Sequence, residues 1–288
     1  MTAPVVAITG ATGYLGSVLE PAFVGAGYSV RRLVRNPRAD TDDREFTLGA
    51  AVEPSTLEDI DVLVHCAYDM KLTKRPEIWE RNVFGTVRLL DAARAVGVRR
   101  TIAVSSMSAY PGTRQLYGRA KLETELAALG RNMVVLRPGL VYGPGWGGMA
   151  RTLRRLSALP VLPDFGKRAY QFTVHEEDLA AAFLMAAGSA NAPTVPLGVA
   201  CPDPLPFRSL LVALAASQGK RVPLFVPTPG IAVLGALRSA ELLGVPLPVR
   251  ADSLLGLLRP APVVENVEVL TELGVHLRSF DSQEGPES

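Results

Sequence analysis

Tyr117 and Lys121 stand four residues apart in a segment, 116–129, whose pattern predicts a helix, so the two side chains share one face. A tyrosine phenol has an ordinary pKa near 10, and an ammonium group beside it stabilises the phenolate and lowers that pKa. A phenol tuned in this way can give a proton to, or take one from, a carbonyl or alcohol oxygen while a hydride moves. The pair therefore predicts oxidoreductase chemistry, against the alternative of two solvated helix residues.

Three serines follow an apolar run at 101–104 that is typical of a buried strand: Ser105, Ser106 and Ser108. Open α/β sheets bind ligands at the carboxyl ends of their strands, and a hydroxyl group placed there can polarise the reacting oxygen. For any one of these serines alone, an ordinary turn residue is the better explanation. The residues by themselves leave the choice among the three open.

Gly10, Gly13 and Gly16 come directly after another apolar run, 5–8, and open a predicted helix at 14–26. Glycines at a strand-to-helix turn let the backbone close tightly and let a pyrophosphate reach the N–H groups at the helix N-terminus. The spacing is G-x-x-G-x-x-G rather than G-x-G-x-x-G, so the turn alone could also be an ordinary strand-to-helix connection. Its place at the start of an alternating chain favours a dinucleotide site.

Arg35 follows the second predicted strand, 28–34. Enzymes that use NAD usually carry an acid at the end of this strand to bond the ribose 2′-hydroxyl, but here the position holds Val34. An arginine suits a 2′-phosphate through charged, bidentate hydrogen bonds. The sequence therefore favours NADP over NAD, with a surface arginine as the alternative.

Strand-like and helical segments alternate along the first half of the chain, which predicts an α/β fold with a doubly wound parallel sheet (Rossmann) covered on both faces. Beyond Pro138 the composition of the sequence changes, and proline and glycine residues cluster. We therefore expect a dinucleotide-binding domain at 1–148, a smaller, mainly substrate-binding C-terminal lobe at 149–280 and a disordered tail at 281–288. The further predicted strands are 61–66 and 133–136, and the further helices are 77–96, ending at Gly97, and a packed amphipathic helix at 231–245.

Several motifs together resemble the extended short-chain dehydrogenase/reductase family, whose nucleotide-sugar members are epimerases and dehydratases. The glycine turn is similar to the family's nucleotide turn, and Tyr117-Gly-Arg-Ala-Lys121 matches its active-site motif. The remaining matches are His65-Cys-Ala67, Asn82-Val-Phe-Gly-Thr86, Leu136-Arg-Pro-Gly-Leu-Val-Tyr-Gly-Pro144 and Val174-His-Glu-Glu-Asp-Leu-Ala180. The resemblance covers nearly the whole chain.

This resemblance implies a catalytic trio of Ser106, Tyr117 and Lys121, with Ser108 as second choice for the serine. It also implies that Lys121 holds the nicotinamide ribose, and that helices 77–96 and 116–129 pair across a two-fold axis into a homodimer. The cofactor contacts that it implies, beside the three glycines and Arg35, are Thr12, Tyr14, Leu15, Cys66, Ala67, Tyr68, Asn82, Tyr117, Lys121, Pro138 and Val141.

Three departures from the family pattern bear on the substrate. Gly139 stands where the family often has an asparagine that contacts a sugar nucleotide, and Ala50-Ala51 replaces a Gly-Asp-Leu that holds adenine. Met107 stands where related sugar dehydratases carry an acid. Dehydratase chemistry is therefore not expected, and sugar-nucleotide binding is in doubt.

The composition excludes several classes of protein. The 288 residues are 48% hydrophobic, and 30 basic residues against 28 acidic ones give a net charge of +2, so nucleic acid is not an expected partner. Two cysteines and three separated histidines indicate neither a disulfide framework nor a metal site. With no signal peptide and no apolar run long enough to span a bilayer, we expect a cytoplasmic protein without a membrane partner.

The sequence predicts an NADP-dependent oxidoreductase that reduces a ketone or aldehyde, with Tyr117 as proton donor and a small carbonyl or alcohol compound as substrate. One alternative is an epimerase of a sugar or sugar nucleotide. Another is a non-catalytic protein that senses a cofactor or acts as a scaffold, although a scaffold need not keep both Tyr117 and Lys121.

Overall fold

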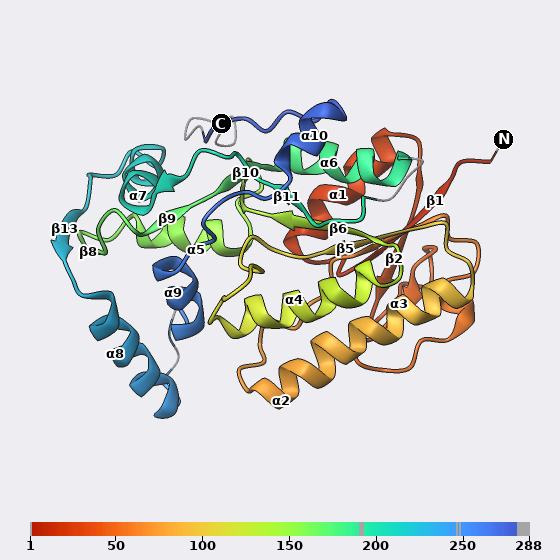
Figure 1. Cartoon of the computed structure of the whole chain (residues 1–288), viewed down its shortest axis with the longest axis horizontal. Helices are drawn as coiled ribbons and strands as arrows, with labels where there is room; N and C mark the ends of the chain where they lie inside the picture. Colours follow the sequence, from red (N-terminus) through yellow and green to blue (C-terminus); the bar gives the residue numbers. More distant parts are fainter. Residues whose placement is uncertain (1, 190–192, 246, 248, 281–288) are drawn as a thin grey trace.

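The computed structural model describes residues 2–189, 193–245, 247 and 249–280. It contains a seven-stranded parallel sheet in the order β11–β6–β5–β4–β1–β2–β3 (Figure 1). The strands are β1 (Val5–Thr9), β2 (Ser29–Val34), β3 (Arg44–Glu45), β4 (Val62–His65), β5 (Arg100–Val104), β6 (Val134–Pro138) and β11 (Leu197–Val199). This is the strand order of a doubly wound sheet, and the predicted fold class is confirmed.

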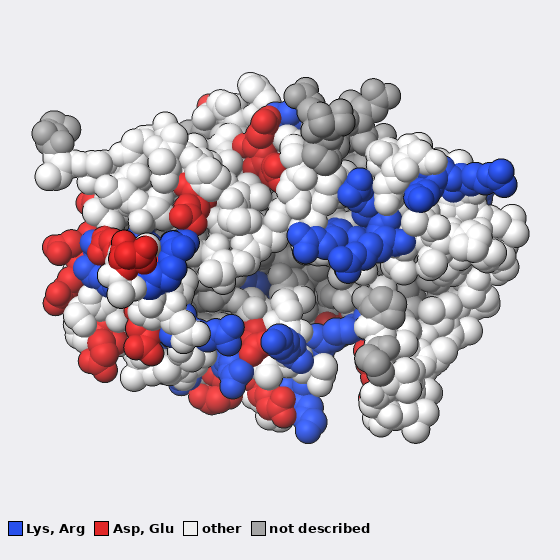
Figure 2. Space-filling model, turned by 180° about the vertical axis from the view of Figure 1, so that it is seen from behind, with Lys and Arg blue, Asp and Glu red and all other residues white. Residues whose placement is uncertain are grey.

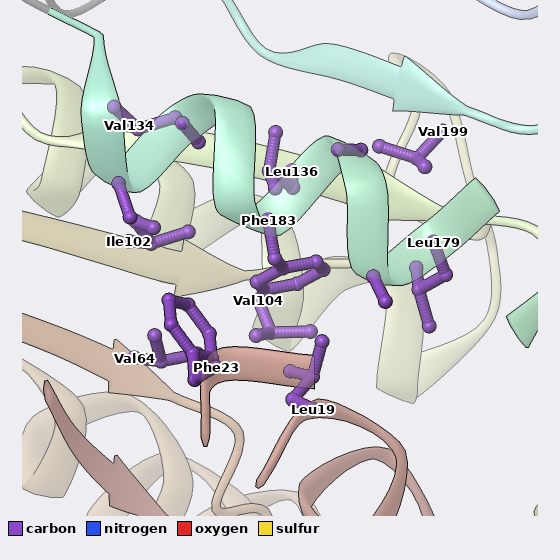
Figure 3. Packing of buried hydrophobic residues seen from close by; sticks show 14 of the residues in the cluster. Leu19, Phe23, Val64, Ile102, Val104, Val134, Leu136, Leu179, Phe183 and Val199 are labelled. Atoms are coloured by element: carbon purple, nitrogen blue, oxygen red, sulfur yellow. The ribbon is translucent and has the colours of Figure 1, made fainter. Parts of the chain in front are cut away.

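The central strands form from continuous apolar runs because helices cover both of their faces. Every residue of β4, β5 and β6 is buried. On one face lie α1 (Tyr14–Gly25), α6 (Glu176–Gly188) and the short α10 (Val267–Glu272) (Figure 1). Figure 3 shows Phe23 of α1 and Phe183 of α6 pointing toward one another above the sheet.

The opposite face is covered by a long composite helix and by α4 (Leu116–Leu129) (Figure 1). The composite helix runs through α2 (Arg75–Ile78), a π-helical segment η2 (Trp79–Phe84) and α3 (Gly85–Ala95). It ends at Gly97, whose φ of +79° is the left-handed conformation that a glycine accepts most readily. The helix predicted at 116–129 has the observed bounds, whereas the one predicted at 77–96 begins two residues earlier and contains the π-helical turn. The 3₁₀ turn η1 (Pro54–Thr56) precedes β4.

The remaining elements form the C-terminal lobe, in which short two-stranded pairs alternate with helices. The strands β7 (Leu140–Tyr142) and β10 (Thr173–His175) are parallel partners, as are β8 (Val161–Asp164) and β13 (Leu224–Pro227), whereas β9 (Tyr170–Gln171) and β12 (Leu205–Pro206) are antiparallel. The lobe's helices are α5 (Gly148–Leu156), α7 (Phe207–Ala216), α8 (Gly230–Leu242) and α9 (Ala251–Leu258). Its core packs Trp146 and Leu153 against Phe207 and Leu210.

Two features of the second half differ from a simple division at residue 148. Helix α6 packs on α1, and β11 is the edge strand beside β6, so both belong to what we call the sheet half of the molecule. The helix predicted at 231–245 exists as α8 and packs on one side only. It lies against α9 and none of its residues is buried. The tail predicted at 281–288 lies outside the described residues.

Within the described part of the chain, no helix is long and apolar enough to cross a bilayer.

Candidate active site

The turn between β1 and α1 has the shape expected of a pyrophosphate cradle. Gly10 has φ +67°, and a Cβ on it would lie 2.9 Å from the backbone nitrogen of Ala67. A Cβ on Gly16 would lie 2.5 Å from Cα of Ala11, so any larger residue would displace the turn. The helix begins at Gly13 with no side-chain cap and no acid in its first turn. Its first N–H groups are therefore available to an anion, and the turn fits a dinucleotide.

A buried chain of polar contacts ties this turn to the next strands. The hydroxyl of Thr9 lies 2.8 Å from Nδ1 of His65 and accepts the N–H of Ala67, while Nε2 of His65 lies 2.8 Å from the hydroxyl of Thr86. Burial, with the Lys121 ammonium close by, lowers the pKa of His65 to about 3 and keeps the ring neutral. Thr9 was not predicted from the sequence as a member of this network, because its partner lies 56 residues away.

Asn82 lies on the π-helical segment and holds the loop that follows β4. Its side-chain oxygen accepts the N–H of Asp69 at 2.7 Å, and its amide donates to the carbonyl of the same residue at 3.3 Å. It also hydrogen-bonds the Tyr68 hydroxyl. A π-helical turn widens the helix by one residue and is often found at functional sites, and here it turns a buried asparagine toward the site loop.

The structure brings Ser106, Tyr117 and Lys121 together at the carboxyl end of β5. The Ser106 side chain lies near the Tyr117 phenol and lowers its pKa. Nζ of Lys121 donates to the carbonyl of Val104 at 2.6 Å and stands 5.9 Å from the centre of the Tyr117 ring. Tyr68 completes the cluster, with its ring 5.0 Å from that of Tyr117, edge to face, and 4.9 Å from the Lys121 nitrogen.

The protonation states differ from the expectation that Lys121 draws the Tyr117 pKa down. Burial raises the pKa of Tyr117 to about 12, and the Ser106 side chain only partly opposes this. Burial also lowers the pKa of Lys121 to about 8. Burial destabilises the Tyr117 phenolate more than the Lys121 ammonium stabilises it at this distance. The phenol therefore stays protonated in the protein.

The geometry distinguishes the three serines. The hydroxyl of Ser105 donates to the buried carboxylate of Glu125, which Arg137 holds with two further bonds of 2.7 and 2.8 Å. Ser105 is therefore turned away from Tyr117. Ser106 faces Tyr117, and its own oxygen accepts the N–H of Ser108 at 3.1 Å. The geometry therefore separates Ser105 from the phenol and places Ser106 beside it, and the catalytic role of Ser106 stays a prediction.

The C-terminal lobe contacts the helix that carries Tyr117. Asp252 of α9 accepts the N–H groups of Leu116 and Tyr117 at 2.8 and 3.2 Å, and so caps α4. Arg250 donates to the carbonyls of Met70 and Leu72 at 2.8 and 3.2 Å. Both residues were missed from the sequence, because they lie more than 130 residues from their partners and belong to no local pattern.

Arg35 lies at the end of β2, is exposed, and has no ion-pair partner among the described residues. The preceding arginines do have partners, since Arg31 pairs with Asp42 at 2.6 Å and Arg32 with Asp43 at 2.8 Å. Arg35 is therefore available to an anion at the strand end where the sequence places the ribose.

The other residues predicted to contact the cofactor are distributed around the site. The carbonyl of Pro138 accepts the N–H of Met107, beside Ser106, and Val141 is buried in the core next to it. Burial raises the pKa of the Cys66 thiol to about 12, and the nearby Lys121 charge opposes this only in part. Thr12 is exposed at the turn, and Leu15 packs against the core.

Tyr14 packs against the loop that enters the C-terminal lobe. A Cβ on Gly147 would lie 2.0 Å from the Tyr14 ring, and the Tyr14 hydroxyl donates to Glu176 at 3.2 Å. Tyr14 lines a cleft of about 680 Å³ together with Thr12, Gly13 and Arg151, and Ser106, Tyr117 and Lys121 do not line it. This cleft is therefore separate from the candidate catalytic cluster.

A doubly wound sheet with a glycine turn at its first strand is the architecture of dinucleotide-dependent enzymes. The sequence model described as the NAD dependent epimerase/dehydratase family matches residues 6–196. The chain belongs to this family, which comprises NAD(P)-dependent oxidoreductases, epimerases and dehydratases.

Among characterised relatives, the chain is similar to a ceramide reductase of Caulobacter vibrioides, 30% identical over 247 residues, which cover 82% of this chain and 78% of the relative. It is also similar to a 3-diazoavenalumate denitrifying reductase of a Streptomyces species, 30% identical over 265 residues, covering 77% and 84%. The uncharacterized protein y4nG of Sinorhizobium fredii is 28% identical over 222 residues (67% of this chain), and the chain spans only 56% of that protein's length.

Solved structures confirm the fold. MoeE5 in complex with UDP-glucuronic acid and NAD superposes with a TM-score of 0.70 at 21% identity, covering 97% of this chain and 95% of that one. A UDP-glucose 4-epimerase of Thermotoga maritima, in complex with UDP-glucose, gives 0.71 at 17% identity, covering 97% and 96%.

Proposed function

We propose that this protein is an NADP-dependent reductase of a ketone or aldehyde. The observation that carries the proposal is the cluster at the end of β5, in which the Ser106 side chain lies near a protonated Tyr117 beside the buried Lys121. Two characterised relatives at 30% identity are reductases by name, which supports the same class of reaction.

The cluster has the groups that carbonyl reduction needs. Bound NADPH supplies a hydride to the carbonyl carbon. The carbonyl oxygen, as it becomes an alkoxide, accepts a hydrogen bond from Ser106 and the proton of Tyr117. A Tyr117 pKa of about 12 keeps the phenol protonated at neutral pH, as a proton donor requires. Lys121, with a pKa of about 8, is mostly charged at that pH and stabilises the phenolate that remains.

Two groups of residues support NADP as the cofactor. The turn at Gly10, Gly13 and Gly16 offers unpaired helix N–H groups to the pyrophosphate. Arg35 offers a guanidinium without an ion-pair partner among the described residues, and Val34 leaves no acid to bond a ribose hydroxyl or repel a phosphate.

Epimerisation of a sugar nucleotide is the second candidate, since structural neighbours such as the Thermotoga enzyme carry out that reaction. The packing around Gly139 speaks against it. A Cβ on Gly139 would lie 2.4 Å from the carbonyl of Phe172 and 2.8 Å from the side chain of Ala200. No asparagine fits at this position, so the sugar-nucleotide contact expected from the family is absent here.

The purified protein should be screened with ketones, aldehydes and sugar nucleotides in the presence of NADPH. A reductase consumes NADPH in proportion to the alcohol formed. An epimerase converts a sugar nucleotide into its isomer with no net loss of NADPH. Turnover of sugar nucleotides alone would overturn the proposal, and NADPH binding without any turnover would favour a cofactor-sensing protein.

We also propose that the protein is a homodimer built on the composite helix and α4. Both helices lie on one face of the sheet and leave Phe84 and Leu126 exposed there. Light scattering at micromolar concentration should give twice the chain mass, and the Leu126→Glu variant should shift the protein toward monomer. A monomeric wild type would contradict this.

A further inference from the structure

The edge of the C-terminal lobe exposes a continuous run of apolar side chains. It comprises β8, β13 and α8, which follow one another along the left-hand edge of Figure 1; we call them the apolar arm. On the parallel pair β8–β13, Val161 and Leu224 are register partners and are 51% and 65% exposed. Val226, two residues further along β13 and on the same side as Leu224, is exposed as well, as is Val222 just before the strand.

Helix α8 continues this surface. Ile231, Arg238 and Leu242 are spaced by seven and four residues, so they share one face of the helix, and all three are exposed. Ile231 and Leu242 are 81% and 88% exposed, which is unusual for side chains of this size. The opposite side of α8 faces α9, and no described element packs extensively on the exposed face.

Basic residues outnumber acidic ones in the segments that carry the apolar arm. Residues 149–175 and 205–245 contain nine Lys and Arg against two Asp and Glu, although the whole lobe, 149–280, has twelve against ten. Both acids are engaged: Asp164 pairs with Arg208 at 3.1 Å, and Glu241 accepts the N–H of Ala251 at 2.8 Å, on the side of α8 that faces α9.

The basic residues are mostly free. Six are exposed and have no ion-pair partner within the described ranges: Arg155, Lys167, Arg168, Lys220, Arg221 and Arg238. Two of them directly precede Val222 at the start of the exposed strand segment. Figure 2, seen from behind, shows basic side chains grouped beside a broad uncharged area on the side of the molecule that carries this lobe, with little acidic surface between them.

We propose that the apolar arm docks on the surface of an anionic membrane. Apolar side chains that reach into the headgroup region, ringed by lysine and arginine, are the features by which proteins bind such surfaces without spanning them. A second copy of this chain fits less well, because a symmetric contact through this surface would bring its unpaired cations together. This proposal departs from the expectation from the sequence that no membrane is a partner.

Docking in this orientation has a consequence for the site. Helix α8 leads into α9, and Gly230 of α8 packs on Leu258 of α9. Helix α9 in turn caps the helix of Tyr117 through Asp252. Membrane contact through the apolar arm therefore brings lipid close to the elements that flank the candidate site. Given the proposed reductase, this points to an amphiphilic carbonyl substrate held in the bilayer.

The docking itself is tested without any substrate. The full-length protein is mixed with vesicles of phosphatidylcholine and phosphatidylglycerol in about a two-to-one ratio, or of phosphatidylcholine alone, and bound protein is measured by flotation. We expect binding to the anionic vesicles, much weaker binding to the neutral ones, and loss of binding in high salt. Absence of binding to anionic vesicles, or equal binding to both, overturns the proposal.

Paired variants locate the surface. The triple change Ile231→Ser, Leu242→Ser and Leu243→Ser should weaken binding ~10-fold or more. The double change Lys220→Glu and Arg221→Glu should weaken it ~20-fold or more. The matched controls, Val24→Ser with Leu273→Ser and Arg94→Glu with Arg99→Glu, change exposed residues of the sheet half and should bind like wild type.

Two further outcomes contradict the docking. If the control substitutions weaken vesicle binding as much as the substitutions in the apolar arm, the protein binds vesicles through its whole surface and not through the arm. If the triple variant turns a dimer into a monomer by light scattering while wild type ignores vesicles, a second copy covers the arm. A failure of carbonyl reduction leaves the flotation result intact, so the two proposals fail separately.

Discussion

Next to the candidate site, the sheet half of the molecule buries a paired carboxylate and guanidinium, whereas the C-terminal lobe leaves charges and apolar side chains in solvent. The side chains of Glu125 and Arg137 are 3% and 7% exposed and are joined by two hydrogen bonds. Glu125 also accepts a hydrogen bond from Ser105, which directly precedes Ser106 in the chain. In the apolar arm, Leu224, Ile231 and Leu242 are exposed beside unpaired cations. The difference teaches that the candidate site is held by internal contacts, while the partner and substrate that we propose depend on a surface exposed to solvent.

The largest effect that sharpens this comparison is on stability. Arg137→Met leaves the buried Glu125 carboxylate with only Ser105, and the free energy of unfolding should fall by about 3–5 kcal/mol. The matched change in the lobe, Arg208→Met, removes an exposed partner of Asp164 and should cost at most about 1 kcal/mol. Denaturant unfolding measures both. Equal losses would mean that the two regions do not differ in this way.

Cofactor affinity comes next. Arg35→Ala removes one charge-assisted phosphate contact and should weaken NADPH binding by about 1.5–3 kcal/mol, roughly ten- to a hundredfold or more, with little change for NADH. Arg221→Ala, an exposed arginine of the lobe, should change neither affinity. Fluorescence titration of both cofactors measures this. A wild type that prefers NADH, or an Arg35→Ala variant that binds NADPH normally, contradicts the NADP assignment.

The pH dependence of stability gives a smaller effect, tied to Lys121. Its pKa falls from 10.5 to about 8 on folding, because burial disfavours the ammonium. Below about pH 8 both states hold the proton and the penalty is constant. Between about pH 8 and 10.5 only the unfolded chain holds it, so the folded state gains stability as pH rises.

Relative to Lys121→Met, wild type should therefore gain about 2 kcal/mol from about pH 8 to pH 10. The neighbouring Cys66 and Tyr117 keep their protons in the folded state over that range, since burial raises their pKa values to about 12, and their titration in the unfolded chain is common to both proteins. The control Lys167→Met changes an exposed lysine of the lobe and should show no such gain over the same range. Chemical denaturation at the two pH values measures the difference, and parallel stability curves for wild type and Lys121→Met would refute a buried ammonium.

The sequence predicted the parts of the site that local patterns encode. The helix at 116–129 and the glycine turn follow from residues close together in the chain, so both appear where they were expected. Asp252 and Arg250 reach the site across more than 130 residues and have no local signal. The choice of Ser106 over Ser105 also depended on tertiary structure, because it is Glu125 that turns Ser105 away.

The pKa of Tyr117 likewise could not be predicted from the local sequence. Spacing places Lys121 on the same helix face, but it says nothing of burial, and burial is the larger influence on both groups. The exposure of α8 was missed for a related reason. An apolar helix usually finds a core, and only the fold shows that this one has α9 on one side and solvent on the other.

The central claim is that Tyr117 donates the proton in an NADPH-dependent reduction, and Tyr117→Phe tests it most directly. The change removes the hydroxyl and keeps the ring that packs on Tyr68. On a carbonyl substrate identified by NADPH absorbance, turnover should fall at least ~100-fold while NADPH binds as in wild type, because the phenol acts in the transition state. Ser106→Ala should lose more activity than Ser108→Ala. Full turnover in Tyr117→Phe would contradict the account.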